Sequence, residues 1–151
     1  MYIQFITTQF GVMKVTATAK KLVTITKVAK KGVDVPNAIT RKVAKELTAY
    51  AKGKLRKFTS ISIHKGTPFE EDVWRAIASI PYGTTKSYGD IARVIGRPQA
   101  VRAVGTATGK NYLCLAIPCH RVIKSDGTHG HYAHGVKMKR ELLAFEKAHS
   151  K

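Results

Sequence analysis

Residues 87–111 read SYGDIARVIGRPQAVRAVGTATGKN, and this stretch decides the fold of the second half of the chain. Ser87, with an acidic residue three positions later, forms a capping box that predicts the start of a helix, and Gly96 predicts its end. Pro98 is the residue type preferred at a first helical position, so a second helix is expected over Gln99–Thr108. Two short helices joined by a glycine turn predict a helix-turn-helix, with the second as recognition helix. The first helix is expected to bury Ile91, Ala92 and Ile95.

Another helix is expected just before this stretch. In Thr67-Pro68-Phe69-Glu70, threonine stands at the N-cap, proline at the first helical position and glutamate at the third, which is again a capping box. Pro81 and Gly83 are expected to close this helix. Its apolar residues recur at helical spacing, which is typical of a face packed in a core: Phe69, Val73, Trp74, Ile77 and Ile80.

The chain after the helix-turn-helix is divided by turn residues. An apolar segment, Leu113–Ile117, leads into Pro118-Cys119-His120-Arg121. Ser125-Asp126-Gly127 predicts a turn and Gly130–Gly135 a loop. An amphipathic helix is then expected over Val136–Glu146, with these residues facing inward: Met138, Leu142, Leu143 and Phe145.

The first third of the chain has strand patterns followed by a helix pattern. Three segments rich in β-branched and aromatic residues alternate with period two and predict an antiparallel meander: Tyr2–Thr7, Val12–Thr18 and Leu22–Val28. Asn37 is a plausible N-cap for a helix that Gly53 ends. The apolar face of that helix is Ile39, Val43, Leu47 and Tyr50. A further short strand is expected over Phe58–Ile63.

Composition changes at His64-Lys65-Gly66, which predicts a domain boundary there. The expected fold class is α/β (α+β), with a small sheet-and-helix domain over residues 1–63 and a helical DNA-binding domain over residues 67–149.

Residues 1–62 carry 13 basic and 2 acidic side chains, net +11, and residues 63–151 carry 14 and 7, net +7. Because both halves are basic, charge alone does not locate a binding surface.

The 151 residues include 27 Lys and Arg against 9 Asp and Glu, a formal net charge of +18. A content of 44% hydrophobic and 24% charged residues excludes a disordered chain, a coiled coil and a fibre. No apolar stretch approaches the ~20 residues of a membrane-spanning helix, and the N-terminus lacks a signal-peptide pattern, so an intracellular protein is expected. Nucleic acid is the commonest partner of so basic a chain, and anionic lipid or plain solubility are the alternatives.

Cys114 and Cys119 are expected to be free thiols, because nothing indicates export. A nucleophilic cysteine needs a basic neighbour and a third group that orients this neighbour. His120 follows Cys119 directly, but adjacent side chains of an extended segment point to opposite sides, so a bridging water or a sharp turn at Pro118 is required. Glu146 is a candidate third group. The alternative is a buried, inert cysteine beside a surface histidine.

His129, His131 and His134 lie close together in the sequence and raise the question of a zinc site. No paired Cys-x-x-Cys and no His-Glu-x-x-His pattern accompanies them. Solvent-exposed histidines are the simpler interpretation, and no metal is predicted.

A longer set of motifs resembles one known family. They are Thr67-Pro68-Phe69, Val73-Trp74, Ile80-Pro81-Tyr82-Gly83, Ser87-Tyr88, Ile91-Ala92, Arg102-Ala103-Val104-Gly105, Ile117-Pro118-Cys119-His120-Arg121-Val122-Ile123, Gly135, Leu142-Leu143 and Glu146. In this order they resemble the DNA-repair alkyltransferases, the methylated-DNA protein-cysteine methyltransferases. The resemblance is colinear from about residue 67 to 147, and residues 1–62 share only the order of elements. The non-catalytic alkyltransferase-like relatives lack the cysteine that stands here as Cys119.

The resemblance implies a function. Members of the family bind duplex DNA from the minor-groove side through the helix-turn-helix, in a winged-helix-like domain. They flip out a guanine alkylated at O6 and transfer the alkyl group to a cysteine in one irreversible turnover without a cofactor. O4-alkylthymine is a further candidate lesion. A monomer without membrane association is implied, in the cytoplasm and on the nucleoid when bound to DNA.

The resemblance also implies roles for individual residues. Cys119 would accept the alkyl group, while His120, through a water, and Glu146 would form its proton relay. Asn111 matches the asparagine that braces the active-site turn. The physical chemistry agrees, because a free cysteine with a pKa of ~8.5 is only slightly ionised at neutral pH and needs a base.

The implied binding residues surround the flipped base. Arg102 matches the arginine that enters the base stack in place of the flipped nucleotide, and Tyr88 the tyrosine that rotates the phosphate and lines the pocket. The loop around Tyr132 would close over the base. Ala133 stands where a serine is frequent, which leaves its backbone N–H to reach the guanine oxygen. Contacts with substrate or DNA are also implied for Arg121 and Val122.

Three departures from the family pattern bear on the size of alkyl group accepted. Tyr112 and Cys114 stand where prolines are common, and His134 replaces a small residue.

Two other functions are alternatives. A cysteine hydrolase built on Cys119, His120 and Asn111 would turn over repeatedly, and a lesion-binding module would bind alkylated DNA without changing its own mass.

Overall fold

The computed structural model describes all 151 residues and forms two compact units. Unit 1 comprises residues 1–62 and 112–116, and unit 2 comprises residues 63–111 and 117–151. The return of residues 112–116 to unit 1 is a feature that the sequence does not reveal. None of the helices combines the length and apolar character needed to cross a lipid bilayer.

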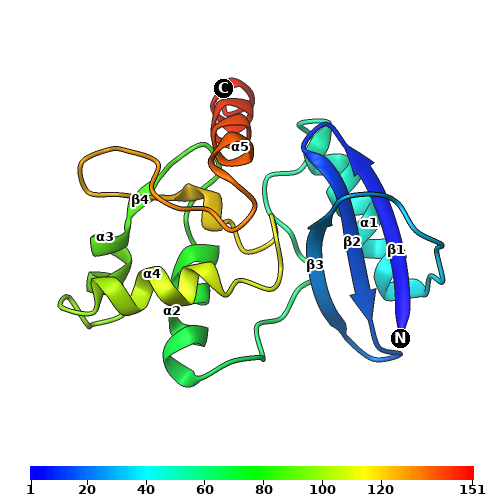
Figure 1. The fold of residues 1–151 in the computed structure, drawn as a ribbon, viewed down its shortest axis with the longest axis horizontal. Coiled ribbons are helices and arrows are strands. Elements are labelled where there is room, and N and C mark those ends of the chain that lie inside the picture. The colour runs from blue at the N-terminus through cyan, green and yellow to red at the C-terminus, as the bar shows by residue number, and fades with distance from the viewer. The chain divides into compact units, whose positions relative to one another are not determined.

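Unit 1 is a three-stranded sheet with one helix across a face (Figure 1). β1 (Tyr2–Thr8), β2 (Gly11–Ala17) and β3 (Leu22–Val28) pair antiparallel in the order β1-β2-β3, and α1 spans Ala38–Ala51. Alternate residues of β2 are buried, as the period-two pattern predicts: Met13, Val15 and Ala17. The predicted meander and helix are confirmed.

The strand expected over Phe58–Ile63 is absent, and that prediction was wrong. The carboxylate of Glu46 on α1 accepts hydrogen bonds from the backbone N–H and hydroxyl groups of Thr59 and Ser60. These backbone donors are therefore satisfied by a side chain instead of a neighbouring strand. Phe58 alone is anchored in the core, where it packs near Tyr50.

Residues 112–116 join unit 1 through β3. The backbone N–H of Ile25 donates to the carbonyl of Tyr112 at 3.0 Å, and the N–H of Cys114 donates to the carbonyl of Ile25 at 3.0 Å. A proline at position 114 would lack this donor. The departure from the family pattern at Cys114 therefore has a structural use in this chain.

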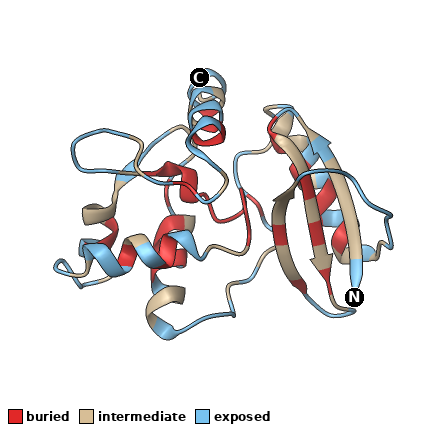
Figure 2. Ribbon diagram, viewed as in Figure 1, coloured by how far each residue is buried: buried red, intermediate tan, exposed pale blue.

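Unit 2 contains the helices that the sequence places after residue 66 (Figure 1). Its elements are α2 (Pro68–Ala78), β4 (Lys86–Ser87), α3 (Tyr88–Val94), α4 (Val101–Gly109), the 3₁₀ helix η1 (Cys119–Arg121), β5 (Val122–Ile123) and α5 (Val136–His149). β4 and β5 pair parallel. The indole N–H of Trp74 donates to the carbonyl of Ala107 at 2.9 Å and ties α2 to α4. Figure 2 shows η1 and the segment before it as buried.

The helix-turn-helix is present, with one correction. The side chain of Ser87 accepts from the N–H of Asp90 at 3.0 Å, so the predicted cap of α3 is confirmed. α4 begins at Val101 and not at Gln99, because the N–H of Ala100 donates to the carbonyl of Arg97 at 2.9 Å. Pro98 therefore occupies the second position of a turn, which suits its fixed φ as well as a helix start does.

Candidate active site

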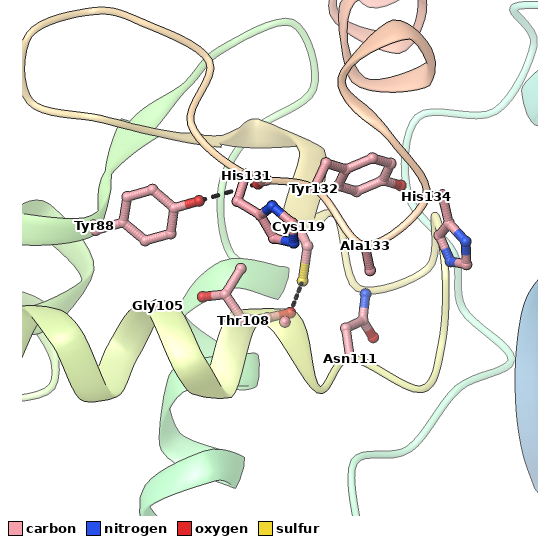
Figure 3. Close-up of a pocket in the computed structure, with 10 residues that line it drawn as sticks. Tyr88, Gly105, Thr108, Asn111, Cys119, His131, Tyr132, Ala133 and His134 are labelled. Atoms are coloured by element: carbon pink, nitrogen blue, oxygen red, sulfur yellow. Dashed lines mark hydrogen bonds between the residues drawn. The ribbon is translucent and has the colours of Figure 1, made fainter.

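Cys119 is the first residue of η1 and is 4% exposed. The thiol donates to the carbonyl of Thr108 on α4, with the sulfur 3.5 Å from the oxygen. The sulfur lies in a recess between α4 and the loop that precedes α5 (Figure 3). The other cysteine, Cys114, is buried in unit 1 and does not line this recess.

The recess is lined by Tyr88, Gly105, Thr108, Gly109, Asn111, Cys119, His131, Tyr132, Ala133 and His134. Its interior holds about 30 Å³, enough for roughly one water molecule. The covering loop, which precedes α5, contributes four of these residues: His131, Tyr132, Ala133 and His134. Gly130 and Gly135 bound this loop at φ of +69° and +94°, a backbone conformation that favours glycine.

Tyr88, at the first position of α3, reaches the same loop. Its hydroxyl donates to the carbonyl of His131 at 3.3 Å (Figure 3). Burial raises the pKa of the Tyr88 phenol, and a negative charge on Cys119 would raise it further. Tyr88 therefore stays protonated at neutral pH and remains a hydrogen-bond donor at the mouth of the recess.

His120 and Glu146 form a fully buried pair. Nε2 of His120 lies 2.6 Å from Oε2 of Glu146. Burial lowers the pKa of His120, and this effect outweighs the opposing attraction of the Glu146 carboxylate. His120 is therefore a neutral imidazole at pH 7. Because an ionised carboxylate only accepts hydrogen bonds, Nε2 carries the proton and Nδ1 is left as an acceptor.

Nδ1 of His120 is buried and has no hydrogen-bond partner within the protein. An orphaned buried acceptor is costly in a folded protein and indicates either a bound water or a functional group. This atom can take up a proton, directly or through a water. Its neighbour in the sequence is Cys119, the residue whose thiol would have to lose one.

Arg121 completes the buried cluster. Its Nε and Nη2 donate to the two carboxylate oxygens of Glu146 at 2.8 and 3.0 Å, and its Nη1 donates to the carbonyl of Ile80 at 2.8 Å. Burial raises the pKa of Glu146, but the hydrogen bonds from His120 and Arg121 and their charges hold that pKa well below its usual range. Glu146 is therefore ionised.

The structure places Arg121 differently from the expected contact with substrate or DNA. Its side chain is buried and its guanidinium is occupied by Glu146 and a backbone carbonyl. It does not line the recess. Sequence reasoning treats an arginine in a basic chain as a surface cation, whereas here its bidentate pair with Glu146 fixes the carboxylate that orients His120.

The remaining expected residues lie in three settings. Asn111 lines the recess and its side-chain N–H donates to the carbonyl of Ile117 at 2.8 Å, across the chain segment that leads to Cys119. Tyr132 and Ala133 line the recess from the covering loop. Val122 is buried outside it, and Arg102 is exposed on α4.

Lys139 on α5 is a buried residue that sequence reasoning missed. Its Nζ donates to the carbonyls of Val122 at 2.6 Å and His131 at 3.3 Å, and so ties the covering loop to β5. Burial lowers the pKa of Lys139 to about 8. Lys139 is seven residues from Glu146, so both lie on one face of the helix, and this spacing was the signal in the sequence for the burial of Lys139.

Replacing Lys139 by methionine tests this tie. The lysine binds fewer protons in the folded state than in the unfolded state between pH 8 and its ordinary value near 10.5, so wild-type stability gains with pH across that window. We expect the free energy of unfolding of wild type, relative to that of Lys139→Met, to increase as the pH rises from 8 to 10.5. Amide exchange of residues 131–133 is expected to quicken in the variant.

Lys137→Met is the matched control, because Lys137 is exposed on the same helix. Denaturant unfolding at several pH values and hydrogen exchange measure both variants. A pH-independent difference for Lys139→Met, or loop exchange equal to that of the control, contradicts the assignment.

No group of three or more histidine, cysteine or acidic side chains is placed to hold a metal ion. His131 and His134 instead line the recess with their neighbours of the covering loop. The ring of His134 packs edge-on against that of Tyr132, with 5.7 Å between centroids.

Comparison with known proteins agrees with this geometry. Residues 68–148 match the family described as "6-O-methylguanine DNA methyltransferase, DNA binding domain". The chain belongs to the methylated-DNA–protein-cysteine methyltransferase family. The resemblance inferred from the sequence motifs is thereby confirmed. Members repair O6-methylguanine in DNA by methyl transfer to a cysteine.

Two curated relatives carry the family name. The chain is 47% identical over 106 residues to the methylated-DNA–protein-cysteine methyltransferase of Methanosarcina barkeri. This aligned region covers 70% of this chain and 67% of the relative. It is 49% identical over 104 residues to the inducible enzyme of Bacillus subtilis, which covers 69% of this chain and 58% of the relative.

Solved structures show the same fold. The O6-methylguanine methyltransferase of Mycobacterium tuberculosis is 33% identical, covers 99% of this chain and 94% of its own, and has a TM-score of 0.87. A second structure of the Mycobacterium tuberculosis protein, in complex with DNA, has a TM-score of 0.88 at the same identity. The expected fold class, a sheet-and-helix unit followed by a helical DNA-binding unit, is confirmed.

Proposed function

We propose that this chain repairs O6-alkylguanine in duplex DNA by moving the alkyl group to Sγ of Cys119, once per molecule. The observation that carries the proposal is the placement of Cys119 in a recess beside a neutral His120 with an unused buried acceptor. Because its substrate is DNA, we also propose that the protein acts in the cytoplasm and lies on the nucleoid when it is bound to DNA.

The proton passes from Cys119 toward His120 in the first part of the proposed reaction. Nδ1 of His120 accepts the thiol proton through a bridging water, and the imidazolium that forms is stabilised by Glu146. Arg121 keeps Glu146 ionised and in place. Asn111 is proposed to brace the turn that presents the thiolate, through its hydrogen bond to Ile117.

The thiolate then attacks the alkyl carbon in line with the bond to O6. One S–C bond forms, the C–O6 bond breaks, and its electron pair passes to the guanine, which takes up one proton to become ordinary guanine. The thioether has no leaving group for a return step, so the protein is consumed. Tyr88 is proposed to donate a hydrogen bond to the base at the mouth of the recess.

The depth of Cys119 requires extrusion of the base. A guanine stacked in a duplex cannot bring its alkyl carbon to a sulfur that is 4% exposed. Flipping costs a few kcal/mol, which contacts elsewhere must offset. We propose that α4 lies against the DNA, that the loop of Tyr132 and Ala133 closes on the base, and that Arg102 enters the vacated stack.

Intact-protein mass spectrometry with peptide mapping tests the proposal. One equivalent of duplex carrying O6-methylguanine is expected to replace one hydrogen of the protein by a methyl group, at Cys119. Cys114 serves as an internal control, because it is buried away from the recess. Modification at Cys114, or more than one turnover per molecule, contradicts the assignment. Binding without any mass change would indicate a lesion-binding module instead.

A further inference from the structure

Unit 1 contains a groove between β1 and α1, far along the sequence from the residues of the active site. The groove has a volume of about 650 Å³. Five of the residues that line it are cationic: Lys31, Arg41, Lys45, Lys52 and Lys54. Phe5 and Ile6 of β1 also line the groove, which therefore combines apolar and cationic residues.

The five cations of the lining form no ion pair within the chain. None of Lys31, Arg41, Lys45, Lys52 and Lys54 takes part in an ion pair, and no acidic residue lines the groove. Like charges four residues apart on a helix, as at positions 41 and 45, disfavour the helix unless an anion lies between them. An external anion would relieve this repulsion.

Positions 1–62 contain only two acidic residues, and neither lines the groove with its side chain. Asp34 accepts a hydrogen bond from the backbone N–H of Phe5 at 2.9 Å. Glu46 accepts from Thr59 and Ser60, on the backbone that follows α1. Five of the 13 basic residues of positions 1–62 therefore line the groove, and neither acidic residue of this segment forms an ion pair with them.

Three cations of the groove recur along one side of α1 and of its C-cap. Arg41 and Lys45 on α1 and Lys52 at its C-cap lie on one side of the helix, because they are four and seven residues apart. At a rise of 1.5 Å per residue these separations are about 6 and about 10 Å.

We propose that this groove binds the sugar–phosphate backbone of duplex DNA, so that unit 1 is a second DNA-contacting surface in addition to the helix-turn-helix. The proposal rests on the proposed function in one respect, that duplex DNA is the substrate. The contact carries no sequence information and adds affinity by release of counterions. A membrane surface fits less well, because Phe5 and Ile6 are only partly exposed and the groove presents no fully exposed large apolar side chain for insertion into a bilayer.

Lysine footprinting of the full-length wild-type chain tests the site directly. The protein is acetylated with and without an undamaged duplex at low salt, and the modified lysines are quantified by mass spectrometry. Lys45, Lys52 and Lys54 are expected to be protected several-fold by the duplex. Lys20 and Lys21, exposed in the turn before β3, are the internal control and are expected to stay reactive. Equal protection of both sets, or none in the groove, overturns the proposal.

Charge-neutralised variants give the second test. The groove variant carries Arg41→Gln, Lys45→Gln and Lys52→Gln, and the matched control carries Lys20→Gln, Lys21→Gln and Lys57→Gln, with the same change in net charge. Each phosphate contact contributes about 0.9 to the slope of log affinity against log salt. Loss of three contacts is expected to lower the slope for duplex DNA by about 2.7 in the groove variant and by little in the control.

Two further measurements distinguish the proposal from alternative explanations. Methyl transfer from the free alkylated base is expected to be unchanged in both variants, so its loss would concern the fold or the active site and not the groove. Equal slopes in groove and control variants would show that net charge alone matters. If the groove variant lost binding only to anionic vesicles, to single strands or to polyglutamate and kept its binding to duplex DNA, the groove would be assigned to that partner and the proposal overturned.

Discussion

Replacing Glu146 by glutamine is expected to lower the free energy of unfolding by about 3 to 5 kcal/mol, the cost of removing one partner of a buried ion pair. The variant keeps the shape of the side chain but leaves the Arg121 guanidinium buried without a counter-charge. Two of the hydrogen bonds of Arg121 and one of His120 end on this carboxylate. Urea unfolding at pH 7 measures the loss.

Glu141→Gln is the matched control for this variant. Glu141 lies on the same helix and is exposed, so its replacement is expected to change stability by less than about 0.5 kcal/mol. A similar loss in both variants would mean that helix charge, and not the buried cluster, determines the result.

Acidification tests the same carboxylate. The pKa of Glu146 is held below its ordinary value of 4.5, so its contribution to stability is present above pH 4.5 and is lost as the pH falls below it. Glu46, Glu70, Asp90 and Asp126 also have lowered pKa values and add to the acid sensitivity of wild type. The stability gap between wild type and Glu146→Gln is therefore expected to narrow below pH 4.5, and a constant gap would contradict the assignment.

The same variant is expected to slow methyl transfer from the free alkylated base. An amide can donate to Nε2 of His120, which moves the imidazole proton to Nδ1 and removes the acceptor for the Cys119 proton. General-base catalysis is worth about 10²- to 10⁴-fold. The rate is measured where the variant remains folded, and an unchanged rate would remove His120 from the proposed relay.

Local chemistry in the sequence predicted the parts of the fold that depend on neighbouring residues. The N-cap predicted at Asn37 and the capping boxes predicted at Thr67 and Ser87 all form. Pro98 shows the limit of such reasoning, because proline fits a turn and a helix start equally well. The choice between them depends on a hydrogen bond between Ala100 and Arg97 that composition does not encode.

Long-range pairing accounts for the other differences. Phe58–Ile63 has a strand pattern, but Glu46, a residue of the preceding helix, takes its backbone donors. Arg121 and Lys139 are cations that sequence reasoning assigns to the surface, yet both are buried against specific oxygens. Which cation is buried depends on tertiary contacts between segments, and the spacing of the residues gives only a weak hint.

Replacing Arg102 by alanine is expected to slow methyl transfer from duplex DNA by about 100-fold or more. Arg102 is exposed at the second position of α4, three residues before Gly105 of the recess lining, and so lies on a neighbouring part of the same helix. If its side chain fills the space of the extruded base, the alanine variant loses the compensation for unstacking. A loss of a few kcal/mol corresponds to about 10² in rate, since about 1.4 kcal/mol is tenfold.

Transfer from the free alkylated base is expected to change little in Arg102→Ala, because that substrate needs no extrusion and meets the same Cys119 and His120. Arg97→Ala is the matched control. Arg97 is exposed in the turn between α3 and α4, so its loss removes a cation but leaves the ratio of the two rates near that of wild type. Cys119→Ala is expected to abolish transfer from both substrates while DNA binding persists.

The ratio of the duplex rate to the free-base rate therefore separates flipping from chemistry. A ratio that falls in Arg102→Ala and holds in Arg97→Ala places Arg102 in the base stack. Equal slowing of both substrates in Arg102→Ala would instead make Arg102 a structural residue of α4. That outcome would contradict the proposal that Arg102 enters the vacated stack and, with it, the assignment of α4 as the recognition helix.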